Sequence, residues 1–260
     1  MKEVFSMWRH TKMVVLVALS AATYAAVLIP FKGFVLIPGF TEVRPASVLP
    51  VVLGLLFGPA GAWGAAFGNL IGDFFGTLTI GSVFGFMGNF FFAFVPYKLW
   101  NKLGLVDSDD KEQLLLNNAK KIINYLLVAV LGALSCALII AWGLELLRLV
   151  PFAVLAGIIS VNNSLPAVIL GIPLLLILYP RIKRWDLLWT EIVDAQELEA
   201  HNALSGLGAA VMIIGIVGGL AAGLTGQVSD AAAGQIAHTR IVLRAGAGVA
   251  LNIVGGLLRK

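Results

Sequence analysis

The residues best suited to bind a ligand in this chain are a few polar side chains set inside long apolar segments. Asn69 and Asp73 stand four positions apart, so a helix would place both on one face. An ionisable residue kept inside an apolar segment is a candidate functional residue, and together the two could bind a polar ligand. The alternative is that Asp73 is solvated near a surface or paired within the protein.

Three asparagines extend this candidate set. Asn89 lies in one apolar segment, and Asn162 and Asn163 lie in another. A buried amide without a partner costs about 1–3 kcal/mol, so each needs a protein group, water or a ligand. Pro166 would clash with the carbonyl of Asn162 and should loosen the helix there. Free backbone acceptors beside two amides could hold a polar solute; hydrogen bonding between helices is the alternative.

A third group of candidates ends a 14-residue connection, residues 31–44. This connection contains glycines and several bulky apolar side chains, which favours a lid folded over a pocket. Glu42 and Arg44 stand at its end and would lie at the mouth of that pocket. A surface ion pair between the two is the alternative interpretation.

The elements that must position these residues are membrane-spanning helices. Hydrophobic residues make up 59% of the chain and charged residues 12%, with a mean hydropathy of +0.95, whereas soluble domains carry about a quarter charged residues. Only segments that satisfy their own backbone groups can cross ~30 Å of hydrocarbon, so the apolar blocks are expected to be helices. We predict eight spans: 13–30, 45–60, 61–80, 81–100, 122–142, 151–180, 203–225 and 240–258.

The basic residues indicate the orientation of the chain. With a cytoplasmic N-terminus, 13 of the 18 lysines and arginines lie inside, in 1–12, 98–121, 181–184 and 259–260. Cytoplasmic loops carry such an excess, so we predict a multi-pass protein of the cell membrane with both termini cytoplasmic. The sequence pI of 9.3 then reflects topology, and no nucleic-acid partner is expected.

An amphipathic stretch divides the chain. Residues 182–198 combine aliphatic residues and tryptophans at helical spacing with charged residues, which predicts a helix lying in the cytoplasmic interface. The predicted fold class is an all-α integral membrane protein. It has a six-helix transmembrane core over 1–181, the interfacial helix and linker over 182–202, and a two-helix C-terminal appendage over 203–260.

Small residues recur at every fourth position in three spans. Ala18, Ala22 and Ala26 do so in the first span, and glycines do so in 64–76 and 215–223. This spacing forms a smooth ridge that another helix can approach closely. For the alanines, docking of a separate membrane subunit is one interpretation and packing within the chain is the other. The glycines are expected to serve packing inside the protein.

The sequence offers no support for catalysis. It contains no G-x-x-x-x-G-K-[ST] motif, so the chain is not expected to hydrolyse ATP. The histidines fall in separate segments and Cys136 is the single cysteine, so no metal, cofactor or catalytic residue is predicted. A solute-binding transport subunit is the leading interpretation. The alternatives are a self-sufficient secondary transporter, although no inverted repeat or coupling-ion site is visible, and a membrane enzyme.

Several stretches together resemble one family, the substrate-binding (S) components of energy-coupling factor (ECF) transporters. They are the alanine pattern of the first span, Arg44-Pro45-Ala46-Ser47, Gly68-Asn69-Leu70-Ile71-Gly72-Asp73 and Asn162-Asn163-Ser164-Leu165-Pro166. The resemblance covers about residues 10–185. It implies a subunit that captures a small, vitamin-like organic micronutrient from outside the cell.

The resemblance also implies partners and site residues. The partners are a transmembrane coupling subunit and two cytosolic ATPases, and the alanine pattern of Ala18, Ala22 and Ala26 would face the coupling subunit. The solute would sit in the outer half, under the first outer loop. The expected substrate-binding residues, including Asp73 from its position beside Asn69, are Glu42, Arg44, Asp73, Asn89, Asn162 and Asn163. Residues 203–260 lie outside the six-helix pattern.

Overall fold

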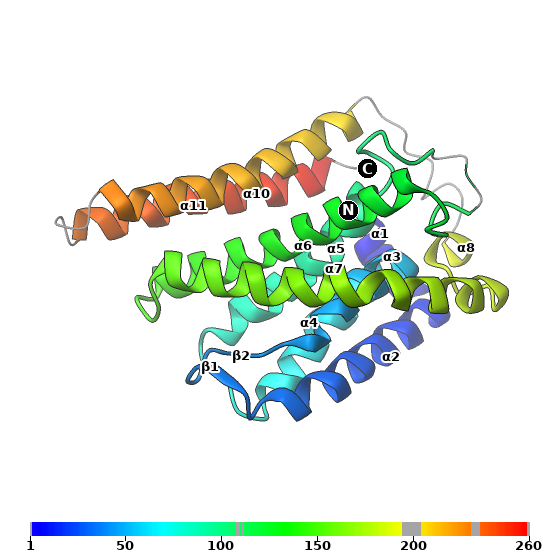
Figure 1. Ribbon diagram of the computed structural model, residues 1–260, viewed down its shortest axis with the longest axis horizontal. Helices are drawn as coiled ribbons and strands as arrows, with labels where there is room; N and C mark the ends of the chain where they lie inside the picture. Colours follow the sequence, from blue (N-terminus) through cyan, green and yellow to red (C-terminus); the bar gives the residue numbers. More distant parts are fainter. Residues whose placement is uncertain (1, 108–109, 111, 194–203, 230–234, 259–260) are drawn as a thin grey trace.

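The computed structural model describes the chain apart from residues 1, 108–109, 111, 194–203, 230–234 and 259–260. The described part consists of helices and one short β-hairpin (Figure 1). In chain order the elements are α1 (Lys2–Ser6), η1 (Met7–Arg9), α2 (Thr11–Leu28), η2 (Ile29–Phe31), β1 (Val35–Ile37), β2 (Thr41–Glu42), η3 (Pro45–Ser47), α3 (Val48–Phe57), α4 (Pro59–Asp73), α5 (Ser82–Leu99), α6 (Ala119–Leu146), α7 (Phe152–Arg184), α8 (Trp189–Ile192), α10 (Leu204–Ser229) and α11 (Gln235–Leu258).

Each predicted span falls on a helix, but the helices differ in length. Among the described residues, five helical segments are long and apolar enough to cross a membrane: Thr11–Phe31, Ala119–Leu146, Phe152–Ile192, Gly206–Thr225 and Ala237–Leu258. The all-α membrane class is confirmed, with the short hairpin as an addition that the sequence did not indicate.

The second and third predicted spans are shorter than expected. α3 has 10 residues and α4 has 15, so at about 1.5 Å per residue they reach only ~15 and ~22 Å, less than the ~30 Å hydrocarbon layer. All residues of α3 are buried, so this helix packs in the interior. The prediction of helix to residue 80 is wrong: α4 ends at Asp73, and Gly76 follows in a turn with a φ of +148° that a helix cannot accommodate.

The glycines of α4 pack inside the protein, as predicted, and their partner is α2; Gly76, the last of the predicted ridge, lies beyond α4 and has nothing within 4 Å. A Cβ added to Gly64 would clash with the Cβ of Ser20, and one added to Gly68 would lie 2.8 Å from the carbonyl oxygen of Ala21. Two helices approach this closely only where one of them lacks side chains. α4 is thereby held firmly along α2, with its C-terminal end at Asp73 beside the start of the first connection.

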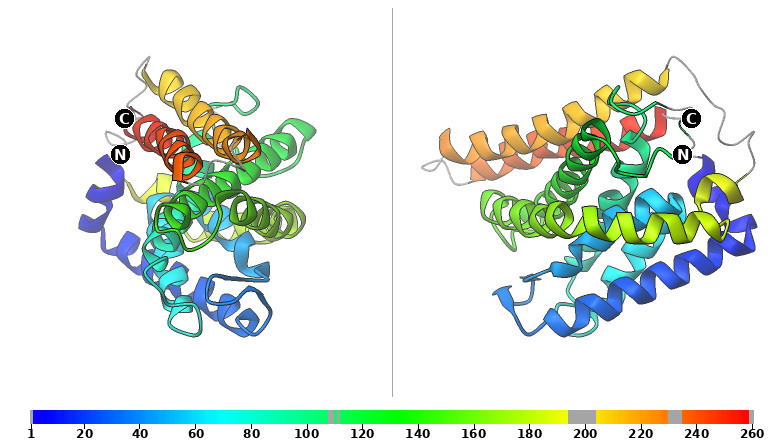
Figure 2. Two further views of the ribbon diagram at one scale, coloured as in Figure 1. Left: turned by 90° about the vertical axis from the view of Figure 1, so that its left-hand side faces the viewer. Right: turned by 45° about the vertical axis from the view of Figure 1, so that its right-hand side comes forward.

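The C-terminal helices α10 and α11 pack against each other and lie along α6 (Figures 1 and 2). They meet at a glycine contact, where a Cβ on Gly219 would lie 2.8 Å from the Cα of Gly248. Asn252 Nδ2 donates to Ser135 Oγ of α6 at 2.6 Å. The pair is therefore anchored to the rest of the molecule by a buried hydrogen bond as well as by apolar packing.

The interfacial helix predicted over 182–198 is not continuous. α7 runs to Arg184, and α8 covers only Trp189–Ile192. Between them Asp186 takes a φ of +51°, which interrupts the helix. The Trp189 side chain covers Gly58 in the α3–α4 turn, where a Cβ would lie 2.6 Å from the indole ring. Residues 194–202 of the predicted linker lie outside the described residues.

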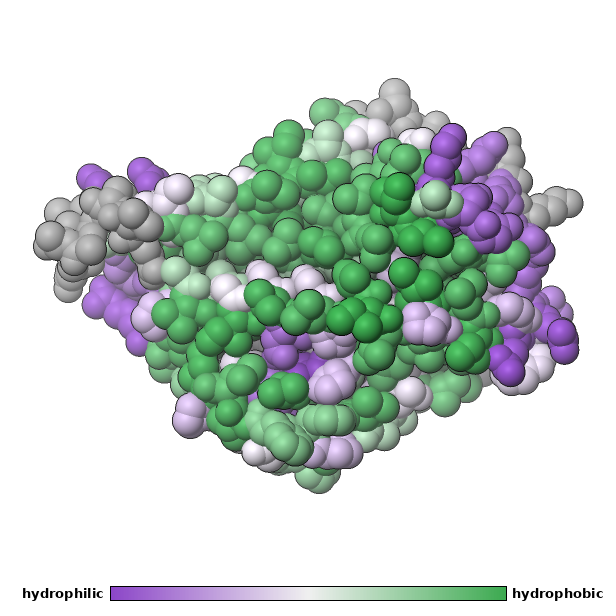
Figure 3. All heavy atoms as spheres, in the orientation of Figure 1, coloured by the Kyte–Doolittle hydropathy of each residue, from purple (hydrophilic) through white to green (hydrophobic). Residues whose placement is uncertain are grey.

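The two ends of the molecule carry different elements. β1 and β2 lie at one end, and α1, α8 and the C-terminal end of α11 lie at the other (Figure 1). Apolar side chains cover most of the visible face between them, and hydrophilic side chains gather toward the end that carries α8 (Figure 3). An apolar belt between polar ends suits a lipid bilayer.

Candidate functional site

The end of the first connection folds inward as β2 and turns Glu42 and Arg44 toward the interior. Their exposed fractions are 2% and 7%, so they are buried rather than placed at the mouth of a pocket. The strand is tied to α7 by Asn162. Its Nδ2 donates to the carbonyl oxygen of Glu42 at 2.7 Å, and its Oδ1 accepts from the backbone N–H of Arg44 at 3.2 Å. Asn162 thus positions the two charged residues through their backbone.

Lys32 completes a buried charge cluster with two carboxylates. Its Nζ lies 3.2 Å from Glu42 Oε1 and 3.2 Å from Asp73 Oδ1. It also donates to Thr77 Oγ1 at 2.5 Å. The three oxygens come from β2, from the C-terminal end of α4 and from the turn after it, so the lysine joins segments that are distant in sequence.

Arg44 is a further member of this cluster, and it is held by uncharged groups as well as by Glu42. Its Nε lies 3.5 Å from Glu42 Oε1, and its Nη2 donates to Asn69 Oδ1 and, at 3.3 Å, to Tyr24 Oη. Asn69 Nδ2 in turn donates to Asp73 Oδ2 at 3.2 Å. The predicted shared face of Asn69 and Asp73 is confirmed, with Arg44 bonded to Asn69 and Lys32 bonded to Asp73.

The remaining predicted amides are occupied by protein groups. Asn89 accepts from Tyr24 Oη at 2.8 Å and donates to the carbonyl oxygen of Gly85 at 2.9 Å. Asn163 accepts from Ser47 Oγ at 2.8 Å and donates to Cys136 Sγ at 3.5 Å. α7 continues through Pro166 as a helix. These two amides pack between helices, which was the alternative interpretation.

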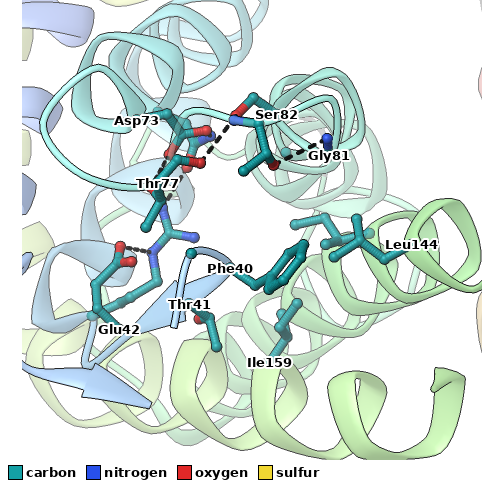
Figure 4. A pocket seen from close by; sticks show the side chains of 15 residues that line it. Phe40, Thr41, Glu42, Asp73, Thr77, Gly81, Ser82, Leu144 and Ile159 are labelled. Carbon is teal, nitrogen blue, oxygen red and sulfur yellow. Dashed lines mark hydrogen bonds and ion pairs between the residues drawn. The ribbon is translucent and has the colours of Figure 1, made fainter. Parts of the chain in front are cut away.

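A small cavity lies against the charge cluster (Figure 4). One side carries Glu42, Asp73 and Thr77, and the other carries the apolar side chains of Phe40, Leu144 and Ile159. Its volume is about 30 Å³, which is room for water but far below the ~300 Å³ of the smallest typical ligand pockets. The full lining is Gly39, Phe40, Thr41, Glu42, Arg44, Asn69, Asp73, Thr77, Thr79, Gly81, Ser82, Gly85, Ile140, Leu144 and Ile159.

One hydroxyl in this lining has no partner among the described residues. Thr41 Oγ1 is buried, and the residue is only 2% exposed. A buried hydroxyl without a hydrogen bond costs free energy, so it marks a place where a ligand could be bound. Thr41 directly precedes Glu42 in β2, and both residues line the cavity.

Two larger hollows lie elsewhere, against the connection between α5 and α6. Their volumes are about 380 and 410 Å³. They are bordered by residues such as Lys120 and Glu112, which are exposed to solvent. A binding site needs convergent polar groups within an apolar enclosure, and the cluster under the hairpin fits that description better. No group of metal-ligating side chains occurs among the described residues.

The sequence therefore identified part of this site. Glu42, Arg44 and Asp73 are brought together and line the cavity, whereas Asn89, Asn162 and Asn163 do not line it. Three further members were not predicted from the sequence: Thr41 and Thr77, which line the cavity, and Lys32, which belongs to the charge cluster beside it. Thr77 follows Asp73 by four residues, which is the same spacing that separates Asn69 from Asp73. This spacing could have identified Thr77 from the sequence.

The comparison with protein families gives a match over residues 14–180 to the family described as QueT transporter. The match extends from α2 to near the end of α7, so it includes every residue of the charge cluster, whereas α10 and α11 lie beyond it. No curated protein and no solved structure matches the chain. Because the match covers more than half of its length, the chain belongs to the QueT transporter family, the S components of ECF transporters.

Proposed function

We propose that this chain captures the queuosine precursor preQ1 at the cell surface for import by an ECF transporter. The family supplies the substrate: QueT transporters are S components for preQ1. PreQ1 is a flat 7-deazaguanine base that carries a primary aminomethyl group, protonated near neutral pH. A binding site for it needs anionic oxygens for the ammonium group and an apolar enclosure for the ring.

The observation that carries this proposal is the pair of buried carboxylates at one cavity. Glu42 and Asp73 are 2% and 7% exposed, and both line it. Phe40 and Ile159, on the apolar side, are suited to pack against a planar ring. Thr41 and Asn69 add hydrogen-bonding groups for the edges of a base. The β1–β2 hairpin lies between η2 and η3, and its residues 39–42 line one wall of the cavity. The hairpin is therefore the element that would move to admit the solute.

Under this proposal the chain divides in function as the sequence analysis expected. Residues 1–181 form the six-helix solute-binding core, residues 182–202 link it to the appendage, and residues 203–260 form the two-helix appendage. The family match ends at residue 180, which supports the first of these boundaries. α10 and α11 would cross the membrane beside α6 without contributing to the cavity.

The proposed partners are a transmembrane coupling subunit and two cytosolic ATPases. The chain would do no chemistry itself, since its sequence has no phosphate-binding loop for ATP. Ala18, Ala22 and Ala26 are exposed on α2, which leaves them accessible for the coupling subunit. α10 and α11 lie on the other side of the molecule from α2, so they would not obstruct this contact (Figure 1).

Direct binding measurements test the substrate. The purified protein should bind preQ1 in isothermal titration, and Asp73→Asn should weaken that binding about 10- to 150-fold, because a hydrogen bond to a charged group contributes roughly 1.5–3 kcal/mol. Glu145→Gln is a matched control. The exposed fraction of Glu145, 8%, is similar to that of Asp73, 7%, but Glu145 is paired with His238 and does not line the cavity. Absence of preQ1 binding by the unaltered protein, or equal effects of both variants, would refute the proposal.

A further inference from the structure

Lys32 occupies a site that surrounds an ammonium ion with three oxygens. An ammonium group has three N–H donors. Lys32 Nζ donates to Asp73 Oδ1 at 3.2 Å and to Thr77 Oγ1 at 2.5 Å, and it forms an ion pair with Glu42 Oε1 at 3.2 Å. The lysine side chain is only 6% exposed. The anionic oxygens that would recognise a cationic solute are therefore already bound by a cation of the protein itself.

The charges of this cluster are balanced. Glu42 and Asp73 contribute two negative charges, and Lys32 and Arg44 contribute two positive ones. A further cation brought into the same buried space would leave one charge uncompensated, which is strongly unfavourable. An exchange of one ammonium for another keeps both the charge balance and the hydrogen bonds. A cationic solute therefore fits this site only if one of the two resident cations leaves.

Lys32 is the resident cation that can leave. Arg44 is held from behind by Asn69 and Tyr24, and its backbone is tied to Asn162. The hydrogen bonds and ion pairs of the Lys32 side chain to described residues are those to Glu42, Asp73 and Thr77. It stands at the C-terminal end of η2, next to the exposed stretch that begins at Gly33, and its flexible stem lies over Gly72. Its ammonium can reach water by rotation of the side chain.

We propose that Lys32 stands in for the ammonium group of the solute and is displaced by it. The inference rests on the proposed function in one respect, that the solute carrying a primary ammonium enters this cavity. Lys32 does not itself line the cavity of about 30 Å³, but the two carboxylates that hold it do. A neutral molecule of the same shape would have to expel Lys32 without replacing its charge, so the two carboxylates favour cationic solutes.

The displacement itself can be observed in the unaltered protein. Lysine labelled with ¹³C at Cε reports the surroundings of each ammonium group by NMR, and the Lys32 signal is identified by its absence in Lys32→Arg. Saturation with preQ1 should move this signal to the position of solvated lysine. The signal of Lys98, which pairs with Glu3 at the opposite end of the molecule, is the control and should not move. A Lys32 signal that stays in place at saturation overturns the proposal.

Affinity measurements provide a second test with a distinct expected sign. Lys32→Met should bind preQ1 about tenfold more tightly or better, because the solute no longer competes with an internal ammonium. The neutral analogue, in which a methyl group replaces the aminomethyl group, should also gain affinity in Lys32→Met, because neither compound then has to expel the lysine. In the unaltered protein preQ1 should bind more tightly than this analogue, because only preQ1 replaces the lost charge. Lys32→Arg keeps the charge and should show no gain for either compound. Unchanged or weaker binding of preQ1 by Lys32→Met contradicts the displacement.

The two proposals fail in different ways. If the unaltered protein binds no preQ1, the proposed substrate is wrong, and the role of Lys32 is then decided by methylammonium in the same NMR experiment. Saturable movement of the Lys32 signal by methylammonium supports the displacement, and no movement refutes it. If Lys32→Met does not fold, Lys32→Gln takes its place in the affinity test, and the NMR measurement remains decisive because it needs only the unaltered protein.

Discussion

The hydroxyl of Thr41 is the residue-scale feature that most directly suggests a contact with solute. Its Oγ1 is buried at the cavity and has no hydrogen-bond partner among the described residues. Glu42 Oε1 and Arg44 Nε also lack a hydrogen bond, but they are engaged in ion pairs. Folding has therefore left the donor and acceptor of this hydroxyl unused beside the cavity. Such a group is unfavourable for stability alone, and this cost is recovered when a ligand bonds to it.

Thr41→Val tests this contact with little change of shape. Replacement should weaken preQ1 binding about 2- to 10-fold, since a neutral hydrogen bond contributes roughly 0.5–1.5 kcal/mol. The melting temperature of the protein without added solute should stay the same or rise, because a buried unpaired hydroxyl is removed. Thr225→Val is the control, since Thr225 is exposed and its hydroxyl donates to the backbone of its own helix, α10. Unaltered affinity in Thr41→Val would show that this hydroxyl does not contact the solute.

At the scale of single helices, α2 presents two different faces. Ala21 and Ala25 are buried, and Ala21 lies against the glycine ridge of α4, whereas Ala18, Ala22 and Ala26 are exposed. The exposed alanines form a smooth strip that is free of internal packing. This arrangement supports the interpretation of these residues as a docking surface for the coupling subunit.

Ala22→Leu should separate transport from solute binding. A leucine there adds bulk to the strip without entering the core, so uptake in cells should be abolished while preQ1 affinity of the purified protein stays nearly unchanged. Ala221→Leu is the matched control, because it adds the same bulk at an exposed alanine of α10. If Ala22→Leu lowers binding and uptake together, the strip packs internally or supports the site, and its docking role is refuted.

The pairing of α10 with α11 gives a second prediction at this scale. Gly219→Ala places a Cβ 2.8 Å from the Cα of Gly248, a backbone atom of α11 that cannot rotate away as a side chain could. The helices must move apart, and such overpacking costs about 1–3 kcal/mol. The melting temperature in detergent should fall. Gly218→Ala, one residue earlier on a face with nothing within 4 Å, should leave it unchanged or raise it. Equal effects of the two variants would argue against a close contact between the helices.

At the scale of the whole molecule, the positions of the elements agree with the predicted orientation. The hairpin and the charge cluster lie at one end, and α1, α8 and the end of α11 lie at the other (Figure 1). The connections predicted to be cytoplasmic by their basic residues are at the second end. An outward-facing cavity and cytoplasmic termini are thus compatible in one molecule.

Cysteine labelling tests this orientation, because the native Cys136 is buried and gives little background. Pro38→Cys, in the exposed turn of the hairpin, should react with a membrane-impermeant maleimide on intact cells. Lys120→Cys, at the exposed start of α6, should react only after the membrane is permeabilised. The reverse pattern would mean that the hairpin faces the cytoplasm, and the proposed capture of solute from outside would be wrong.

The sequence by itself determined the class of protein and the local relations of its residues. Apolar blocks of sufficient length have to become helices, because no other structure satisfies the backbone in hydrocarbon. Spacing within one helix also places residues reliably: Asn69 and Asp73 share a face as predicted, and the glycines of α4 form the ridge that packs on α2. These relations follow from 3.6 residues per turn and need no knowledge of neighbouring elements.

Only the tertiary structure decided which polar groups meet. Lys32 is 41 residues from Asp73, and Asn162 is 120 residues from Glu42. The periodicity of each helix says nothing about how far it is shifted along its neighbours, and a shift of one turn, about 5.4 Å, exchanges one set of partners for another. For this reason the amides expected to bind solute are instead bonded to protein groups. Lys32, which the sequence did not mark as a site residue, lies at the centre of the charge cluster, because packing of η2, β2 and α4 brings its ammonium to both carboxylates.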